Sequence, residues 1–203
     1  MLRFDSDYLE GAHPEVLKKL TESNFDQTPG YGEDIYCAKA RGLIRELCGS
    51  EHADIHFLVG GTQSNLTLIL AALRPHQGVI AAQTGHISVH ETGAVEATGH
   101  KILTVPSEDG KVTVSSVKEI YEGHYNDPSR EHSVQPGMVY ISDPTELGTV
   151  YTRKEIEDLS VFCREKGMFL FLDGARLGYA LAAEGSDISL MDLTELCDAF
   201  YIG

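Results

Sequence analysis

Residues 168–176 read Met-Phe-Leu-Phe-Leu-Asp-Gly-Ala-Arg, an apolar run that ends in an acidic and then a basic residue. The run is typical of a strand in a parallel sheet, because helices cover both faces of such a strand. Asp173 then stands at the carboxyl end of the strand, the edge where parallel sheets bind their ligands. A buried carboxylate there is costly to desolvate, so it usually has a cationic or metal partner.

The rest of the chain alternates between strand-like and helix-like segments. Short apolar runs predict further strands, at 55–59, 79–82, 101–105, 138–142 and 199–202. Apolar residues at helical spacing predict helices, at 14–20, 34–47, 63–74, 87–98, 117–121, 154–166 and 175–183. This alternation predicts an α/β fold, a mostly parallel sheet flanked by helices, with an N-terminal helical segment in front of it.

Local signals predict where several of these elements begin and end. Ser115 is expected to cap the helix at 117–121. Gly167 is expected to end the helix at 154–166. Gly93 weakens the prediction of one continuous helix over 87–98. The polar stretch 123–136 is expected to be a long surface loop.

The length of 203 residues favours one large domain over two, since a domain averages about 150 residues. We expect residues 1–50 to form a helical segment that packs on a large domain at 51–203. The last residues fall inside the strand predicted at 199–202. A stable domain rarely ends on an uncovered central strand, so we expect the chain to continue in a longer polypeptide.

The chain has 16 basic and 31 acidic residues, a formal net charge of −15. This charge argues against nucleic acid or an anionic membrane as the main partner. A small anionic ligand remains compatible, because a helix N-terminus and one or two arginines can bind it locally. The acidity also has a simpler interpretation, which is that it keeps the protein in solution.

The four cysteines form no C-x-x-C pair, which leaves buried, reduced thiols as the simplest interpretation. The N-terminus is acidic and lacks the apolar core of a signal peptide. The longest uncharged apolar stretch, 57–73, contains glycine and polar residues that do not suit a membrane span. We therefore expect a cytoplasmic protein.

Polar residues follow four of the predicted strands, at 60–62, 83–86, 143–146 and 173–176. Because the carboxyl ends of parallel strands meet at one edge, these residues are expected to form the site. The stretch 60–65, Gly-Gly-Thr-Gln-Ser-Asn, joins a strand to a helix and can bind a phosphate through free N–H groups. It matches no established phosphate-loop motif, and an ordinary turn with a helix cap explains it equally well.

Asp173 and Arg176 have two interpretations. Asp173 can pair with a protonated ring nitrogen while Arg176 binds an anionic oxygen, or Arg176 is simply the counter-ion of Asp173. His86 is placed to stack on a planar cofactor. His86 and His90 lie four positions apart and suit zinc, but a third ligand is not evident, so we expect no metal site.

Six segments, taken together, resemble the threonine aldolase (β-eliminating lyase) family of pyridoxal-phosphate enzymes. They are 6–7, 30–34, 60–65, 85–86, 91–94 and 173–177, the last reading Asp-Gly-Ala-Arg-Leu. The resemblance implies the large domain of the aspartate-aminotransferase fold type, with residues 51–203 as the cofactor-binding domain, incomplete at its C-terminus.

The resemblance also assigns roles to individual residues. It implies that the phosphate of pyridoxal 5′-phosphate binds at Gly61 and Thr62, and that His86 stacks on the pyridine ring. Asp173 would pair with the ring nitrogen and Arg176 would lie near the ring hydroxyl. A carboxylate at Asp173 keeps that nitrogen protonated, which lets the ring accept electrons. His86 and Asp173 are the catalytic candidates.

The activity implied is cleavage of a β-hydroxy-α-amino acid, threonine or allo-threonine, to glycine and acetaldehyde. Two alternatives stay open: another pyridoxal-phosphate β-eliminating lyase that acts on a different amino acid, and a non-catalytic α/β scaffold. The family resemblance further implies a homodimer or homotetramer whose sites are completed by a neighbouring subunit. The substrate would be a small amino acid.

The sequence departs from the family pattern in three places. The Schiff-base lysine of the family is expected beyond Gly203, so the chain as given lacks it. Glu146 stands where many aldolases have a histidine, and it is a candidate to replace that residue at the substrate. Ser6 is expected to face the substrate too, although residues 8–11 after it, Tyr-Leu-Glu-Gly, are unusual for the family.

Overall fold

A computed structural model describes residues 6–203 and divides the chain into two compact units, Met1–Gly42 and Leu43–Gly203. The first unit contains helix α1 (Pro14–Ser23), in which Pro14 occupies the first turn, where its missing N–H costs no hydrogen bond. Helix α2 (Ile35–Cys48) begins in the first unit and ends in the second. The domain division expected from the sequence, at residue 50, stays a prediction.

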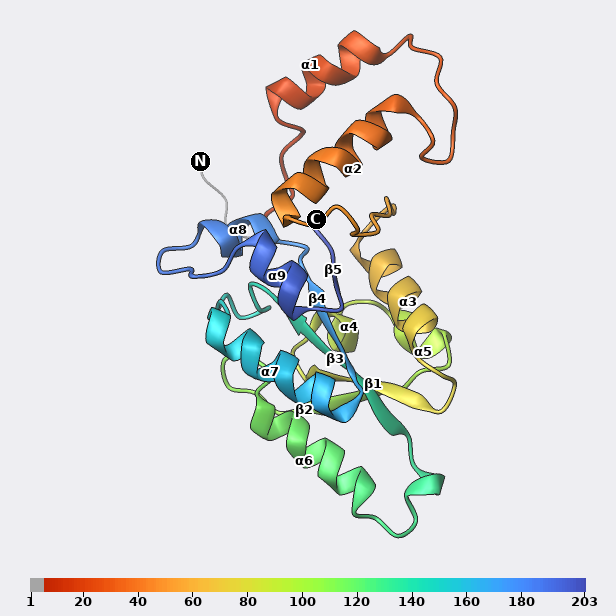
Figure 1. The fold of residues 1–203 in the computed structure, drawn as a ribbon, viewed down its shortest axis with the longest axis vertical. Helices are drawn as coiled ribbons and strands as arrows, with labels where there is room; N and C mark the ends of the chain where they lie inside the picture. The colour runs from red at the N-terminus through yellow and green to blue at the C-terminus, as the bar shows by residue number, and fades with distance from the viewer. Residues whose placement is uncertain (1–5) are drawn as a thin grey trace. The chain divides into compact units, whose positions relative to one another are not determined.

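The second unit is built on a five-stranded parallel sheet with the order β2-β1-β3-β4-β5 (Figure 1). Its strands are β1 (Gln77–Ala82), β2 (Ile102–Val105), β3 (Gln135–Ser142), β4 (Phe169–Asp173) and β5 (Ala199–Phe200). The chain runs from β1 outward to β2 and then returns to the other side of β1 for β3. The strand order therefore reverses between β1 and β3, and such a reversal opens a crevice for ligands at the carboxyl ends of the strands.

Helices pack on both faces of this sheet, as the apolar run of β4 predicts. They are α3 (Gly61–Ala72), α4 (His86–Val89), α5 (Ala94–Ala97), α6 (Val114–Tyr125), α7 (Arg153–Lys166), α8 (Leu177–Ala182) and α9 (Leu190–Leu196). Leu170 and Leu172 belong to the core shared with α6, α7 and α9, whereas Phe171 belongs to the core shared with α3 and α5. The prediction of an α/β fold with a covered parallel sheet is confirmed.

Most predicted elements are present, and some of their ends differ from the expectation. Gly167 ends α7 with φ +65°, as expected. The cap of α6 is Thr113 rather than Ser115, because Thr113 has extended backbone and its hydroxyl accepts the N–H of Ser116. Since α6 runs on to Tyr125, and a 3₁₀ turn (Arg130–His132) follows before β3 begins at Gln135, the loop predicted at 123–136 is wrong in length.

Two further predictions are wrong. Residues 55–59 form no strand in the described part of the chain and do not belong to the five-stranded sheet, and Val59 is 95% exposed. The helix predicted at 87–98 is broken into α4 and α5, since Gly93 has a left-handed φ of +76°. The short helix α9 was not predicted. Across residues 6–203, none of the helices has the length and apolar character to span a membrane.

Candidate active site

Polar side chains from four separate elements meet at the carboxyl edge of the sheet, beside the reversal of strand order. Asp173 is the last residue of β4, and Glu146 lies in the loop after β3. His86 opens α4, which follows β1 directly. Asn65 comes from α3, the helix that covers one face of the sheet.

Asp173 is only 4% exposed and accepts four hydrogen bonds. Its Oδ1 receives the hydroxyl of Tyr201 at 2.5 Å and the backbone N–H of Ala175 at 3.0 Å. Its Oδ2 receives the hydroxyl of Tyr140 at 2.5 Å and the amide of Asn65 at 3.0 Å. All four donors are neutral groups, so they orient the carboxylate without cancelling its charge. The site therefore favours a cationic ligand group beside Asp173.

The two tyrosines remain hydrogen-bond donors over the whole physiological range. Burial raises the pKa of Tyr140 well above its ordinary value, and the negative charge of Asp173 raises it further. The pKa of Tyr201 is raised for the same two reasons, with burial again the larger. Both hydroxyls thus keep the proton that they donate to the carboxylate.

A second buried carboxylate, Glu91, links His86 to the same cluster. Its Oε1 lies 2.8 Å from Nδ1 of His86 and 2.7 Å from Nδ2 of Asn65. The amide nitrogen of Asn65 thus bonds both Glu91 and Asp173. His86 itself is partly exposed, with its ring centroid 5.4 Å from that of His90.

Glu146 faces Arg176 at the mouth of the site. Nη1 of Arg176 lies 3.8 Å from Oε2 of Glu146, and both side chains are partly exposed. Burial raises the pKa of Glu146, while His86 and Arg176 oppose that rise by their positive charge. A carboxyl group with a raised pKa, held beside a cation, is suited to accept and return a proton.

Thr145 holds the loop that carries Glu146. Its hydroxyl lies 2.7 Å from that of Thr149 and 3.3 Å from the carbonyl of Asp109. The side chain of Thr145 leaves room for no more than a hydrogen on Gly110, where a Cβ would lie 2.8 Å from the threonine hydroxyl oxygen. The loop is therefore fixed by hydrogen bonds and by close packing.

The start of α3 adjoins this cluster. Its cap, Gly60, provides no side-chain hydrogen bond, so the first N–H groups of the helix at Gly61 and Thr62 depend on other partners. A Cβ on Gly61 would lie 2.7 Å from the hydroxyl oxygen of Tyr201, which shows how closely the helix start approaches the Asp173 cluster. N–H groups at the start of a twelve-residue helix suit an anion such as phosphate.

Three buried side-chain atoms have no hydrogen-bond partner within the described residues: Oδ1 of Asn65, Oγ1 of Thr84 and Oε2 of Glu91. All three residues lie at this edge of the sheet, Thr84 in the turn after β1. Such atoms are rare in folded proteins because each one costs desolvation energy. Their concentration here fits a site that binds a polar ligand. The residues described contain no group of three or more metal-binding side chains.

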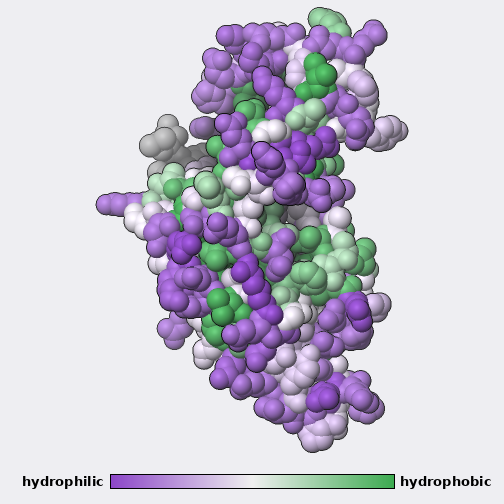
Figure 2. Space-filling view, in the orientation of Figure 1, coloured by the Kyte–Doolittle hydropathy of each residue, from purple (hydrophilic) through white to green (hydrophobic). Residues whose placement is uncertain are grey.

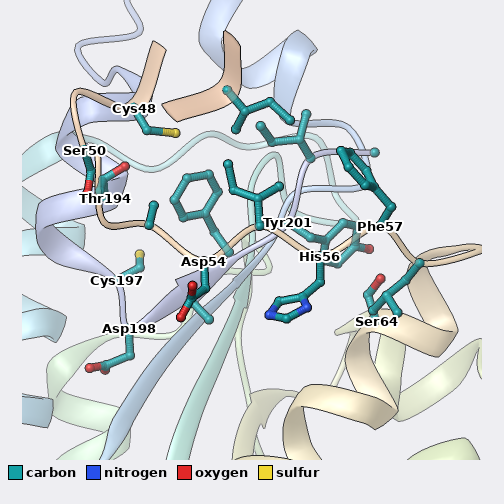
Figure 3. A pocket seen from close by; sticks show the side chains of 18 of the residues that line it. Cys48, Ser50, Asp54, His56, Phe57, Ser64, Thr194, Cys197, Asp198 and Tyr201 are labelled. Carbon is teal, nitrogen blue, oxygen red and sulfur yellow. The ribbon is translucent and has the colours of Figure 1, made fainter. Parts of the chain in front are cut away.

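A cavity lies beside the cluster rather than on it. It has a volume of about 740 Å³ and runs from the end of α2 along residues 52–61 to β5. Figure 3 shows His56 and Ser64 near Tyr201 at one end, and Cys197 and Asp198 at the other. Figure 2 shows hydrophobic residues gathered beside α3. The cavity meets the candidate site at Gly61 and Tyr201, and Asp173 does not line it.

The structure brings together four of the side chains expected from the sequence, namely His86, Glu146, Asp173 and Arg176, with Gly61 and Thr62 at the adjoining helix start. Ser6 lies in the first unit, where its hydroxyl is 3.5 Å from the N–H of Tyr8, and its expected contact with substrate stays a prediction. The roles of all seven residues likewise stay predictions.

Four supporting residues received no role from the sequence: Asn65, Glu91, Tyr140 and Tyr201. A usable signal existed for two of them. Tyr140 is a polar-tipped residue in the middle of an apolar strand, and a buried tyrosine hydroxyl usually has a partner. Glu91 is an acidic residue in a segment with apolar positions on both sides, Val89 and Val95. Asn65 ends the stretch 60–65 that the family resemblance includes, but nothing there pointed to its contact with Asp173, and nothing local marked Tyr201.

Comparison with known proteins places the chain among related sequences. A family described as beta-eliminating lyase matches residues 4–203. The low specificity L-threonine aldolase of Pseudomonas aeruginosa is 32% identical over 185 residues, which are 90% of this chain and 52% of that protein. The enzyme of the same name from Saccharomyces cerevisiae is 27% identical over 200 residues, 97% of this chain and 49% of that one. The chain spans about half the length of the curated relatives it matches.

Solved structures agree with the fold. The threonine aldolase of Leishmania major is 51% identical and superposes with a TM-score of 0.93, over 97% of this chain and 56% of that chain. The alanine–glyoxylate aminotransferase of Nostoc sp. superposes with a TM-score of 0.56 at 19% identity, over 87% of this chain and 45% of the other. The second likeness concerns the fold alone, and it confirms the expected aminotransferase-type architecture.

Proposed function

Because the chain belongs to the beta-eliminating lyase family, we propose that the protein cleaves a β-hydroxy-α-amino acid, threonine or allo-threonine, to glycine and acetaldehyde, with pyridoxal phosphate as cofactor. The observation that carries the proposal is the buried carboxylate of Asp173, held by four neutral donors at the edge that also presents His86, Glu146 and Arg176. The relatives named as L-threonine aldolases support the same reaction.

The residues present fit the cofactor. A buried carboxylate without a charged donor suits a protonated ring nitrogen, and the unpartnered atoms of Asn65 and Glu91 suit a polar ligand. The phosphate would bind the N–H groups of Gly61 and Thr62, at the positive end of α3. His86 would stack on the ring, and Arg176 would bind its hydroxyl oxygen.

The chemistry that pyridoxal phosphate supplies when bound is an electron sink for the pair left on Cα. Asp173 would favour this role, because its negative charge would keep the ring nitrogen protonated. The four donors to Asp173 hold the carboxylate in one orientation before any ligand binds. His86 would stack on the ring and help to hold the cofactor in one position.

Glu146 takes the proton of the substrate's β-hydroxyl group on one of its carboxylate oxygens. The hydroxyl carbon becomes the carbonyl carbon of acetaldehyde, the Cα–Cβ bond breaks, and its electron pair stays with Cα. Cα then takes up a proton from water to give glycine, and Glu146 releases the proton that it took. Arg176 stabilises the ionised form of Glu146 before the transfer, and the partial burial of Glu146 makes its carboxylate a stronger base.

The finer expectations belong to the same proposal. The cofactor-binding lysine would lie beyond Gly203, and residues 51–203 would form the cofactor-binding domain. Ser6 would face the substrate. The protein would act as a homodimer or homotetramer in the cytoplasm, within amino-acid metabolism. These statements rest on the family resemblance and on the sequence.

The test is glycine formation from L-threonine and L-allo-threonine by the full-length protein with pyridoxal phosphate. Wild type is expected to turn over at least one of the two. Asp173→Asn keeps the shape of the side chain but removes the charge, so turnover should fall by about 100-fold or more, as when one preorganised electrostatic partner is lost. Asp158→Asn, an exposed change on α7, serves as the control and should leave turnover unchanged.

Turnover of neither substrate by the wild type would overturn the proposal. Equal turnover in wild type and Asp173→Asn would show that the carboxylate does not serve the ring nitrogen. Release of a different product from another amino acid would favour the alternative of a β-eliminating lyase.

A further inference from the structure

We propose that Glu91 is a positioning residue that orients both His86 and Asp173, so that one buried carboxylate fixes the two side chains expected to contact the plane and the ring nitrogen of the cofactor. This inference rests on the proposed function. It concerns contacts that the chain forms among its own residues, His86 to Glu91 to Asn65 to Asp173.

The backbone directs Glu91 into the site. Glu91 lies in the turn between α4 and α5, is only 4% exposed, and is followed by Thr92 with φ +52° and Gly93 with φ +76°. A β-branched residue such as Thr92 rarely adopts a left-handed conformation, and strain of this kind gathers at functional sites. The turn therefore maintains a costly geometry whose result is an inward-pointing carboxylate.

The contact with Glu91 fixes which nitrogen of His86 carries the hydrogen. An ionised carboxylate only accepts hydrogen bonds, so Nδ1 of His86 must be the protonated nitrogen in the 2.8 Å contact. In the neutral ring Nε2 is then the unprotonated nitrogen. The same bond also prevents the imidazole ring from rotating about its Cβ–Cγ bond. A ring that stacks on a cofactor needs such a fixed orientation.

Asn65 extends this control to Asp173. Its amide group has two hydrogens, and the structure directs one to Glu91 at 2.7 Å and one to Asp173 at 3.0 Å. The opposite assignment of nitrogen and oxygen would place an amide oxygen against two carboxylates, so the two contacts settle the orientation of the side chain. Glu91 thereby fixes Asn65, and Asn65 fixes Oδ2 of Asp173.

A purely structural role accounts poorly for this arrangement. An apolar residue would fill the turn without the desolvation cost of a buried carboxylate. Both partners of Glu91 belong to the candidate site, and its second oxygen, Oε2, has no partner within the described residues. Within the described residues, the side-chain hydrogen bonds of Glu91 thus go to two residues of the candidate site, His86 and Asn65.

The test has a readout that needs no activity. Full-length protein, labelled with ¹⁵N-histidine and free of cofactor, is examined at alkaline pH by two-bond ¹H–¹⁵N correlation, with His86→Gln used to assign the signals. Wild-type His86 is expected in the Nδ1–H form. Glu91→Ala should convert it to a mixture of both tautomers and weaken cofactor binding by about tenfold, the loss expected for one charge-assisted hydrogen bond.

Two variants separate positioning from loss of packing. Glu91→Gln keeps an acceptor oxygen, so the Nδ1–H form should persist and cofactor affinity should stay within about threefold of wild type. Asn65→Ala should leave the tautomer of His86 unchanged and still weaken cofactor binding, because it removes the bonds to Glu91 and Asp173 but leaves the contact between Glu91 and His86. Glu96→Ala, an exposed change on the neighbouring α5, is the control and should alter neither readout.

A wild-type His86 in the Nε2–H form would overturn the inference whether or not any variant folds. An unchanged tautomer in Glu91→Ala would overturn it too, as would equal effects of Glu91→Ala and Glu96→Ala. If the full-length wild type binds no pyridoxal phosphate, the proposed function fails, and the tautomer of His86 still decides the role of Glu91.

Discussion

The hydroxyl of Tyr201 lies 2.5 Å from Oδ1 of Asp173 and donates a hydrogen bond to it. The two residues lie at the carboxyl ends of adjacent strands. Asp173 is the last residue of β4, and Tyr201 comes directly after β5, which pairs with β4 in parallel. Burial and the charge of Asp173 raise the pKa of Tyr201, so the donor stays protonated. The end of the sheet is thus tied to the carboxylate that the proposed function needs.

Tyr201→Phe is expected to lower the free energy of unfolding by about 2 kcal/mol, the value of a hydrogen bond to a charged group. The ring stays in place and only the donor to Asp173 is lost. Urea unfolding of the full-length protein without cofactor measures the change. Tyr179→Phe removes an exposed hydroxyl from α8 and is the control. Equal stability of wild type and Tyr201→Phe would mean that the bond contributes nothing.

Two glycines four residues apart are predicted to respond in opposite ways to alanine. A Cβ on Gly174 would lie 1.9 Å from the carbonyl oxygen of Tyr201, a contact that only backbone movement can relieve. Gly174→Ala should therefore destabilise the protein by about 2 kcal/mol or more. Gly178 lies on α8 with open space around it, so Gly178→Ala should gain up to about 1 kcal/mol of helix propensity. Thermal unfolding of both variants checks the contrast.

Glu146 is predicted to determine how the rate of threonine cleavage falls at acid pH. Burial raises its pKa above the ordinary value of 4.5, and a base must be ionised to act. The rate of threonine cleavage should therefore rise with pH through a midpoint above 4.5. Glu146→Gln should abolish this rise and lower kcat by about 100-fold or more, the usual contribution of a general base. A pH profile of kcat/KM that keeps its acid limb in Glu146→Gln would contradict the assignment.

Asp143 is predicted to make the protein less stable as the pH rises. Burial raises its pKa from 3.8 to about 6, so between these values the folded protein holds a proton that the unfolded chain releases. Its contribution to stability is therefore full below pH 3.8 and lost as the pH rises through 6. The shift of roughly 2 units corresponds to about 3 kcal/mol.

Asp143→Asn keeps an acceptor for the N–H of Tyr151, which bonds Oδ1 at 3.0 Å, and removes the charge. Urea unfolding should find this variant more stable than wild type at neutral pH and equal to it in acid. Asp158→Asn, which changes an exposed aspartate, is the control. A stability gain that is the same in acid and at neutral pH would exclude the titration of Asp143 as its cause.

The fold class follows from short-range patterns that can be seen in the sequence. The apolar run before Asp173 requires cover on both faces, and Leu170 and Phe171 do enter opposite cores. Gly167 ends α7 because a left-handed residue there costs glycine little. The polar residues after the strands meet at one edge because parallel strands all end there. His86, Glu146, Asp173 and Arg176 were therefore predictable as neighbours.

Residues 55–59 show where such patterns stop being sufficient. Their apolar character predicts a strand, but they are not one of the five strands of the sheet, because a place in a sheet depends on where segments distant in the chain lie and not on apolar character alone. The cap of α6 is a milder case, because Thr113 and Ser115 are both suitable residues and the backbone geometry selects the first.

The sequence by itself determined the alternation of strands and helices, the parallel sheet and the edge at which the charged residues gather, because each follows from residues close together in the chain. Only the tertiary structure decided what surrounds those charges. Asn65 lies 108 positions from Asp173 and 26 from Glu91, yet its amide bonds both. A hydrogen bond of this kind is lost or gained when the distance between side chains of different elements changes by a few tenths of an ångström. Packing sets those distances, and no local pattern of residue types encodes them.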